Sequence, residues 1–262
     1  MTTRPVALVT GASSGIGREF ARVLAQEGHD LVLVARRRDE LETLGQELTA
    51  AHGTESLVVP ADLSTDDAVP TVEAAVRAAG LDIDVLINNA GLGGHGRFAA
   101  TDPASDEQQL RVNILALTRL TKVFLPPMLD RRRGHILNLA STAAFQPGPY
   151  MAIYYASKAY VLSFTEALAE ELRGTGVTAT ALCPGAVATE FFDVAGVDRS
   201  SPIARSPGAK TAPFVARAGY DGMMRGRAVV VPGVLNRIGM ESLRIAPRSL
   251  VPRVVARLHP PD

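Results

Sequence analysis

The chain has little of three things: cysteine, net charge and long hydrophobic runs. Cys183 is the only cysteine among its 262 residues, so no disulfide can form within the chain, which fits a reducing compartment such as the cytoplasm. The 27 basic residues balance the 27 acidic residues, and this balance gives no support for binding nucleic acid. No apolar stretch approaches the roughly 18 residues that a membrane-spanning helix needs, so we predict no transmembrane segment.

Histidine is also sparse, and its five residues are scattered along the chain without the spacing of a metal site. We therefore expect no metal. What the chain does have is a globular composition, with 47% hydrophobic and 21% charged residues. Its length fits one large α/β domain, and no linker divides it.

Short, β-branched apolar runs alternate with longer segments of helical periodicity. We expect strands at 5–10, 30–35, 56–60, 83–88, 134–140, 177–183 and 228–231. Expected helices are 15–27, 39–51, 65–79 with Ser64 as N-cap, a long region from 103 interrupted by Pro126-Pro127, and 152–173. This alternation predicts a Rossmann-type α/β fold, in which a doubly wound parallel sheet of about seven strands carries helices on both faces.

We interpret residues 1–262 as a single dinucleotide-binding catalytic domain with two appendages. The first is an excursion at about 190–227, rich in glycine, proline and arginine, which forms either a lid over the site or a plain surface insertion. The second is a helical tail at about 236–258, where apolar residues alternate with arginines. We expect this tail to pack on the body or on a partner subunit; a membrane-facing amphipathic segment is the alternative.

A glycine-rich loop follows the first strand and opens the first helix. Such glycines let the backbone turn tightly against a pyrophosphate, and the helix N-terminus offers free N–H groups to it. The loop has the spacing Gly-x-x-x-Gly-x-Gly, longer than the commoner Gly-x-Gly-x-x-Gly. The expected contacts in it are Gly11, Ser13, Ser14, Gly15, Ile16 and Gly17.

The end of the second strand selects between the two nicotinamide cofactors. An acidic residue there would bind the ribose 2′-hydroxyl of NAD, but this chain has Ala35 followed by Arg36 and Arg37. Guanidinium groups suit a 2′-phosphate, so we predict NADP(H); solvated arginines ahead of a helix are the alternative. Asp62, after the third strand, would accept a hydrogen bond from the adenine amino group or simply start a turn.

Tyr154 and Lys158 lie four residues apart, on one face of an expected helix. An ammonium beside a phenol favours the phenolate, so we expect Lys158 to lower the pKa of Tyr154 and make it a general acid and base. Ser141 ends the fifth strand and reaches the same edge of the sheet. Tyr155 has no lysine four residues on, and we expect it to be a packing residue.

These motifs together resemble the short-chain dehydrogenase/reductase family, in its compact branch with a serine–tyrosine–lysine site, over residues 5 to about 190. The resemblance implies catalytic roles for Asn113, Ser141, Tyr154 and Lys158, with Asn113 at a helix kink holding a water. Tyr154 and Lys158 would also contact the cofactor. The resemblance adds further cofactor contacts at Leu63, Asn89, Ala90, Gly91, Pro184, Gly185, Val187 and Thr189.

The predicted function is reduction of a ketone or aldehyde to an alcohol, with NADPH as hydride donor. Alternatives are an oxidative, hydroxysteroid-like secondary-alcohol dehydrogenase and a catalytically silent NADPH sensor. We expect a non-ionic, small-molecule substrate, and the resemblance implies a homodimer or homotetramer paired through 106–131 and 152–173. Expected substrate-facing residues are Gly93, Gly94, His95, 146–150 and 191–194.

Overall fold

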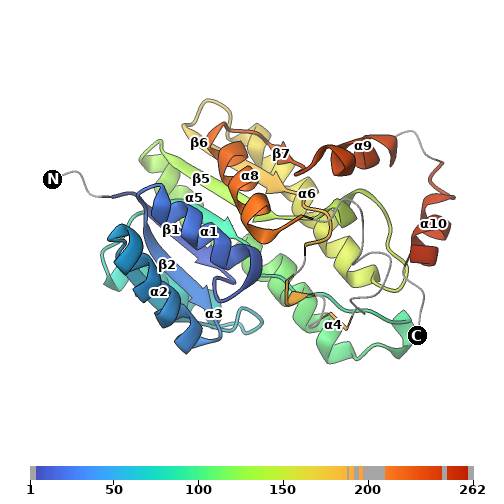
Figure 1. Ribbon diagram of the computed structural model, residues 1–262, viewed down its shortest axis with the longest axis horizontal. Coiled ribbons are helices and arrows are strands. Elements are labelled where there is room, and N and C mark those ends of the chain that lie inside the picture. Colours follow the sequence, from blue (N-terminus) through green and yellow to red (C-terminus); the bar gives the residue numbers. More distant parts are fainter. Residues whose placement is uncertain (1–3, 188, 192–194, 197–209, 244–246, 259–262) are drawn as a thin grey trace.

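A parallel sheet of seven strands forms the centre of the computed structural model, which describes residues 4–187, 189–191, 195–196, 210–243 and 247–258 (Figure 1). The strands lie in the order β3-β2-β1-β4-β5-β6-β7. Their bounds are β1 Val6–Thr10, β2 Asp30–Ala35, β3 Ser56–Pro60, β4 Ile83–Asn88, β5 Gly134–Leu139, β6 Val177–Leu182 and β7 Val229–Val230. Every pairing is parallel, so the predicted doubly wound α/β fold is confirmed.

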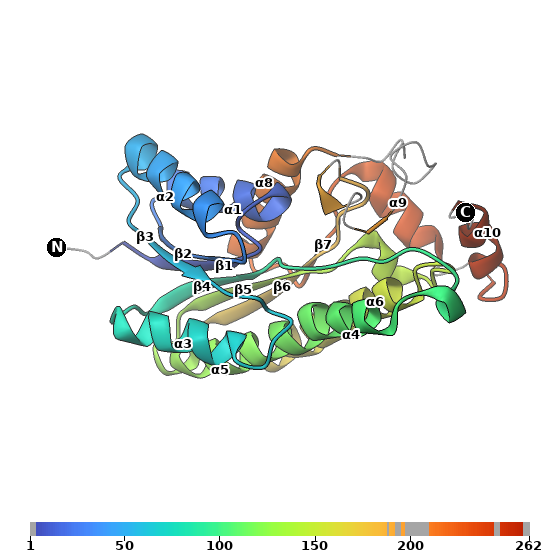
Figure 2. The ribbon, with the colours of Figure 1, turned by 90° about the horizontal axis from the view of Figure 1, so that it is seen from below.

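Helices cover both faces of the sheet (Figure 2). One face carries α1 (Gly15–Gln26), α2 (Arg38–His52) and α8 (Ala212–Met224), and the other carries α3 (Ala68–Ala78), α4 (Pro103–Leu110), α5 (Leu117–Asp130) and α6 (Ala152–Glu171). Successive strand residues point to opposite faces. In β1, Ala7 packs into the apolar layer under α1, α2 and α8, and Leu8 packs into the apolar layer under α3 and α5. Each short apolar strand therefore contributes side chains to both layers of the core.

Helix α3 begins later than predicted, and Ser64 does not cap it. The Ser64 N–H and hydroxyl both donate to the Asp62 carboxylate, at 3.0 and 2.8 Å, in a turn before the helix. Asp67 occupies the N-cap position instead. The polar residues that suggested a cap at Ser64 therefore stabilise the loop that follows β3.

The predicted interruption at Pro126 and Pro127 is wrong, because α5 continues through both residues to Asp130. Each proline removes one backbone hydrogen bond. Phe124 and Met128 are buried against the sheet on either side of the pair, and this packing offsets the loss. The irregularity lies upstream, where Arg111–Ala116 forms a π-helical segment, η2.

The helical stretch Pro103–Asp130 is long and apolar enough to cross a membrane by length and composition. It nevertheless belongs to the core, since Val112, Leu120 and Met128 pack in the layer beneath the sheet. This is the ordinary behaviour of a buried helix in an α/β protein.

The last part of the expected excursion contains a core helix, α8. Residues 192–194 and 197–209 lie outside the described residues, but α8 packs along α1 and buries Val215 and Met223. Its helical period is weak because glycines occupy the contact face. A Cβ on Gly219 would come 2.7 Å from Leu182 and Phe20, and one on Gly222 would come 2.3 Å from Val230.

The expected tail forms two helices, α9 (Val234–Leu243) and α10 (Val251–Leu258). The prediction that the tail packs on the body is confirmed for one side of α10. Val255 is buried in a cluster with Met151, Tyr155 and Ala195, and Val251 packs against the same cluster. Two short 3₁₀ turns complete the described elements, η1 (Phe98–Ala100) and η3 (Thr142–Phe145).

Candidate functional site

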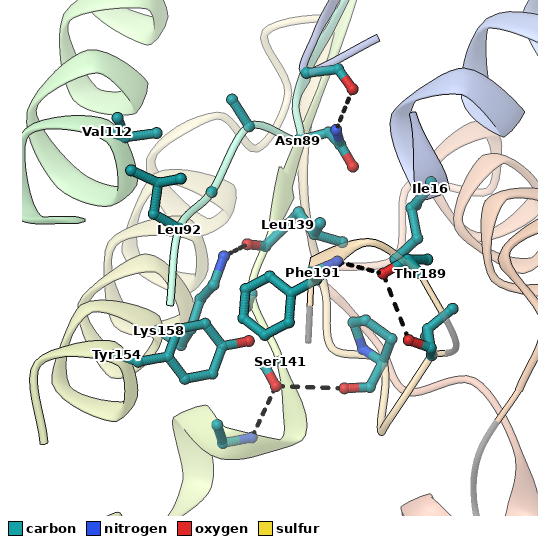
Figure 3. A pocket seen from close by; sticks show the side chains of 18 of the residues that line it. Ile16, Asn89, Leu92, Val112, Leu139, Ser141, Tyr154, Lys158, Thr189 and Phe191 are labelled. Atoms are coloured by element: carbon teal, nitrogen blue, oxygen red, sulfur yellow. Dashed lines mark hydrogen bonds between the residues drawn. The ribbon is translucent and has the colours of Figure 1, made fainter. Parts of the chain in front are cut away.

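A cavity of about 590 Å³ opens at the carboxyl ends of the strands (Figure 3). Ligands in open α/β sheets bind at this edge. Most of the predicted site residues line it: Gly11, Ser13, Ser14, Gly15, Ile16, Arg36, Arg37, Asp62, Leu63, Asn89, Ala90, Gly91, Ser141, Tyr154, Lys158, Pro184, Gly185, Val187 and Thr189. Gly17 and Asn113 lie behind this lining, and their contacts explain why.

Glycine is required at the three positions of the first loop for different structural reasons. Gly11 and Gly15 adopt positive φ angles of 66° and 54°, which side chains other than glycine rarely accept. Gly17 has an ordinary φ but no room, since a Cβ there would come 2.3 Å from the carbonyl oxygen of Gly11. The loop thus lies tightly under the first turn of α1. Ser14, the N-cap residue, makes no side-chain cap bond to that turn.

Asn89 holds this loop from the neighbouring strand. Its Nδ2 donates to the carbonyl oxygen of Thr10 at 2.8 Å, and its own N–H donates to the Thr10 hydroxyl at 3.0 Å. The N–H of Ala90 donates to the same hydroxyl. Thr10 is therefore a supporting residue that sequence reasoning passed over, although it stands directly before the glycine-rich loop.

Two arginines stand at the end of β2, and both are exposed. The Arg37 guanidinium donates to Ser13 Oγ at 3.3 Å and to Glu190 Oε2 at 3.1 Å. It therefore joins the glycine-rich loop to the segment that follows β6.

Arg36 lies near Asp62. Burial acts to raise the pKa of the Asp62 carboxyl, but hydrogen bonds from Ser64 and the charge of Arg36 outweigh it, so the pKa falls below its ordinary value. The expectation that Asp62 starts a turn is confirmed by its bonds to Ser64, whereas its contact with an adenine amino group stays a prediction, at a position that lines the cavity.

Ser141 and Tyr154 meet at the floor of the cavity. The Tyr154 hydroxyl points toward Ser141 in Figure 3, and the Ser141 side chain acts to lower the pKa of Tyr154. Ser141 Oγ accepts from the N–H of Ala143 at 3.1 Å, which fixes it at the start of η3. Burial raises the pKa of Tyr154 to about 12, against the smaller opposite effect of Ser141.

The expected lowering of the Tyr154 pKa by Lys158 is therefore wrong for this structure. Lys158 is buried, its Nζ donates to the carbonyl oxygen of Leu139 at 2.7 Å, and it lies 5.8 Å from the centre of the Tyr154 ring. Burial lowers the pKa of Lys158 to about 8. Spacing on the helix made the two side chains neighbours, but desolvation of both outweighs the charge of the ammonium.

Asn113 acts here as a clamp. It lies in the π-helical segment η2, in line with the expected helix irregularity. Its Oδ1 accepts from the N–H of Leu92 at 2.8 Å, and its Nδ2 donates to the Leu92 carbonyl at 2.9 Å and to Ser157 Oγ at 3.0 Å. The residue thus fixes the segment after β4 to helix α6. Its expected water contact stays a prediction.

Phe191 covers the catalytic side of the cavity. Its ring lies 5.2 Å from that of Tyr154, and a Cβ on Gly93 would come 2.7 Å from it. Among the other expected substrate-facing residues, Gln146 lines the cavity, whereas residues 192–194 lie outside the described residues. Tyr155 is buried against Gly148, where an added Cβ would come 2.2 Å from its ring, as expected of a packing residue.

Helix α9 supplies cavity residues that sequence reasoning missed. Leu235, Asn236, Gly239 and Met240 all line the cavity. They follow one another at intervals of one, three and one residues, which places them on one side of a helix. This spacing was the feature of the sequence that could have identified them. Glycine again permits the approach, because a Cβ on Gly185 would come 2.8 Å from the Asn236 side chain.

The cavity suits a nicotinamide dinucleotide on its own chemistry. The uncapped N-terminus of α1 can receive a pyrophosphate, with Ser13 and Ser14 beside it. Arg36 and Arg37 stand where the adenosine ribose would lie, and Lys158 and Tyr154 stand at the other end. Among the described residues, no group of three histidine, cysteine or acidic side chains gathers as a metal site would require.

Comparison with known proteins agrees with this geometry. The short chain dehydrogenase family model matches residues 5–199. A very-long-chain 3-oxoacyl-CoA reductase of Anas platyrhynchos is 32% identical over 203 residues, which are 75% of this chain and 64% of that protein. The chain thus spans less than two thirds of that relative's length.

Solved structures are similar over nearly the whole chain. A short-chain dehydrogenase from Sphingobium yanoikuyae in complex with NADPH is 34% identical, with a TM-score of 0.83 over 94% of both chains. A short chain dehydrogenase/reductase from Burkholderia phymatum in complex with NAD is 31% identical, with a TM-score of 0.81 over 91% of this chain and 92% of that one. With the family model covering most of its length and the same fold in these relatives, this chain belongs to the short-chain dehydrogenase family of oxidoreductases.

Proposed function

We propose that this protein is an NADP(H)-dependent oxidoreductase that reduces a ketone or aldehyde to an alcohol. The observation that carries the proposal is that the Tyr154 hydroxyl points toward Ser141 in the cavity, beside the buried Lys158 (Figure 3). A hydroxyl pair of this kind can hold a carbonyl oxygen from two sides and protonate it.

The bound nicotinamide would supply the hydride. Ser141, held by the N–H of Ala143, donates a hydrogen bond to the substrate carbonyl oxygen and polarises it. Tyr154 donates its proton to the same oxygen as negative charge develops there. With its pKa raised to about 12, Tyr154 is protonated at neutral pH, the form that it needs to act as the acid in reduction. Lys158, as a cation, stabilises the negative charge left nearby.

The choice of NADP(H) rests on Arg36 and Arg37, because no acidic residue occupies the end of β2. The relative from Sphingobium yanoikuyae was solved with NADPH, and the one from Burkholderia phymatum with NAD, so the family accepts both. Fluorescence titration with NADPH and NADH tests the choice. We expect tighter binding of NADPH in the native protein and a selective loss of NADPH affinity in Arg36→Ala; equal affinities in the native protein would contradict it.

The catalytic assignment is tested by Tyr154→Phe. Loss of the hydroxyl should lower turnover of a ketone by roughly 10²-fold or more, the size of a general-acid contribution, while NADPH affinity is retained. Tyr160→Phe, on the outer side of the same helix, is the matched control. Near-native turnover of Tyr154→Phe would end the assignment.

The lining on the substrate side is apolar, with Phe191, Met151, Leu235 and Met240. We therefore propose a non-ionic carbonyl compound as the substrate class. The Anas platyrhynchos relative is named for a 3-oxoacyl-CoA, whose long acyl chain is apolar but whose CoA part is anionic, so its name does not support a non-ionic substrate.

We also propose a homodimer or homotetramer paired through the outer faces of α5 and α6. Leu115, in η2 just before α5, and Tyr160 of α6 are exposed, and the Tyr160 ring stacks on Phe164 at 5.8 Å. Such apolar side chains on two adjoining helices are typical of a subunit contact. Size-exclusion chromatography with light scattering tests this, and a monomer at micromolar concentration would contradict it.

A further inference from the structure

Helices α9 and α10 carry an exposed apolar surface at one end of the molecule, where both views place them (Figure 1, Figure 2). We call it the tail surface, and it consists of Val234, Leu235, Ile238, Leu250 and Val254. Their side chains are between 49% and 69% exposed. An exposed leucine or valine alone is unremarkable, but four on two short helices, with Leu250 directly before α10 as a fifth, are not.

The two helices are amphipathic, and they are anchored by their other sides. On α9, Asn236, Gly239 and Met240 line the cavity. On α10, Val255 is 3% exposed and belongs to the cluster that includes Tyr155. Apart from Leu235, which also lines the cavity, the side chains of the tail surface lie away from these contacts.

Positive charge accompanies the tail surface. Residues 234–258 contain five arginines against one acidic residue, Glu241, in a chain with 27 basic and 27 acidic residues overall, so the rest of the chain is acidic. Of these arginines, Arg237, Arg248, Arg253 and Arg257 lie in the described part and are exposed. Arg253 and Arg257 flank Val254 within a single turn on either side, so apolar and basic side chains share the outer side of α10.

We propose that the tail surface docks on an anionic lipid bilayer. Apolar side chains with arginines around them are the two signals that together hold a protein at a membrane surface. A second copy of the chain is a poor occupant, because a two-fold contact through this surface would bring the arginines of α10 near their own copies. An acidic inner leaflet is also the membrane that a cytoplasmic protein meets.

Docking in this way would bring the cavity to the membrane. Leu235 belongs both to the tail surface and to the cavity lining. A carbonyl substrate dissolved in the bilayer would then reach Tyr154 along α9 without crossing water. This consequence rests on the proposed function, whereas docking itself does not.

Flotation with phospholipid vesicles tests the docking without any measurement of activity. The native protein should float with phosphatidylcholine vesicles that contain phosphatidylglycerol, and not with phosphatidylcholine alone; high salt should release it. Arg253→Gln with Arg257→Gln should weaken binding roughly 30-fold, at about fivefold per arginine. Ile238→Ser with Val254→Ser should abolish flotation while leaving the charges intact.

The matched control is Met224→Ser with Arg225→Gln, which removes one exposed apolar and one exposed basic side chain at the end of α8, outside the tail surface. It should float like the native protein. NADPH affinity and the melting temperature show that each variant is folded. Absence of flotation in the native protein, or equal flotation of all variants, overturns the proposal. So does an oligomer that Ile238→Ser with Val254→Ser dissociates, because the surface would then bind a second copy.

Discussion

At the residue scale, the chemistry depends on two groups whose pKa values are moved by burial. Burial raises the pKa of Tyr154 to about 12 and lowers the pKa of Lys158 to about 8. Both shifts favour the neutral form, as desolvation always does. The phenol is thereby kept as a proton donor, while the ammonium loses its proton close to physiological pH.

Lys158 should therefore set the alkaline limit of the reduction. Its cation is present below about pH 8 and is lost as the pH rises through that value. We expect kcat/KM for ketone reduction to be level near neutrality and to fall about tenfold per pH unit above the pKa of Lys158. Steady-state rates between about pH 6 and pH 10 measure this, since that range spans the shifted and ordinary pKa values of lysine.

The control for this profile is Lys158→Arg, because a guanidinium stays charged over the whole range. Its residual activity should lack the fall near pH 8. A native profile that stays flat through the alkaline range would show that Lys158 is not the titrating group.

At the element scale, the N-terminus of α1 shows how local sequence and close packing combine. The spacing of the glycines after β1 predicted a tight loop followed by helix α1. It also suits the binding of a phosphate group at the start of that helix. Two contacts make Gly17 necessary: the Gly11 carbonyl oxygen of the same loop lies 2.3 Å from where its Cβ would be, and Asn89 of the distant segment after β4 lies 2.4 Å from it. Sequence periodicity describes one element at a time and does not contain such contacts.

Gly17→Ala should destabilise the fold and weaken NADPH binding together. The added Cβ would come 2.3 Å from a backbone oxygen, which cannot move aside without distorting the loop. We expect a loss of about 1–3 kcal/mol in the free energy of unfolding. Chemical denaturation and NADPH titration measure the two effects.

Gly239→Ala is the control, because this glycine also lies in a helix but has nothing within 4 Å of an added Cβ. Alanine should stabilise α9 there by up to about 1 kcal/mol, the difference in helix propensity. If both variants were equally stable, close packing at Gly17 would not be the reason for its glycine.

Local sequence patterns did not predict where two of the helices begin and end. Pro126 and Pro127 are helix breakers in isolation, yet α5 passes through them because Phe124 and Met128 are buried. In α8, glycines hid a helix because they serve contacts with Leu182, Phe20 and Val230. In both cases tertiary packing outweighed intrinsic propensity.

At the scale of the whole molecule, one sheet carries two apolar layers. Leu86 and Ile87 are neighbours in β4 and both are fully buried, but Leu86 packs in the layer with α3 and α5 and Ile87 in the layer with α1 and α8. If the chain is one domain, as predicted, the two layers should unfold together.

Leu86→Ala and Ile87→Ala should each lower the free energy of unfolding by about 2–5 kcal/mol, because each leaves a cavity in a packed layer. Thermal unfolding of either variant should keep a single transition at a lower temperature. Met224→Ala, at an exposed position, should shift it little. Two separate transitions in either variant would show that the layers are independent units.

The sequence by itself determined the order of strands and helices, the edge of the sheet where the motifs gather, and the residue types of the catalytic and nucleotide sites. These follow from short-range patterns: apolar periodicity, glycine in the first loop, and four-residue spacing on a helix. Only the tertiary structure decided the direction of the Tyr154 pKa shift, the clamp of Asn113 on Leu92, and the part of α9 in the cavity. Burial and contacts between distant segments are properties of the folded chain, and no local pattern encodes how much water a side chain loses.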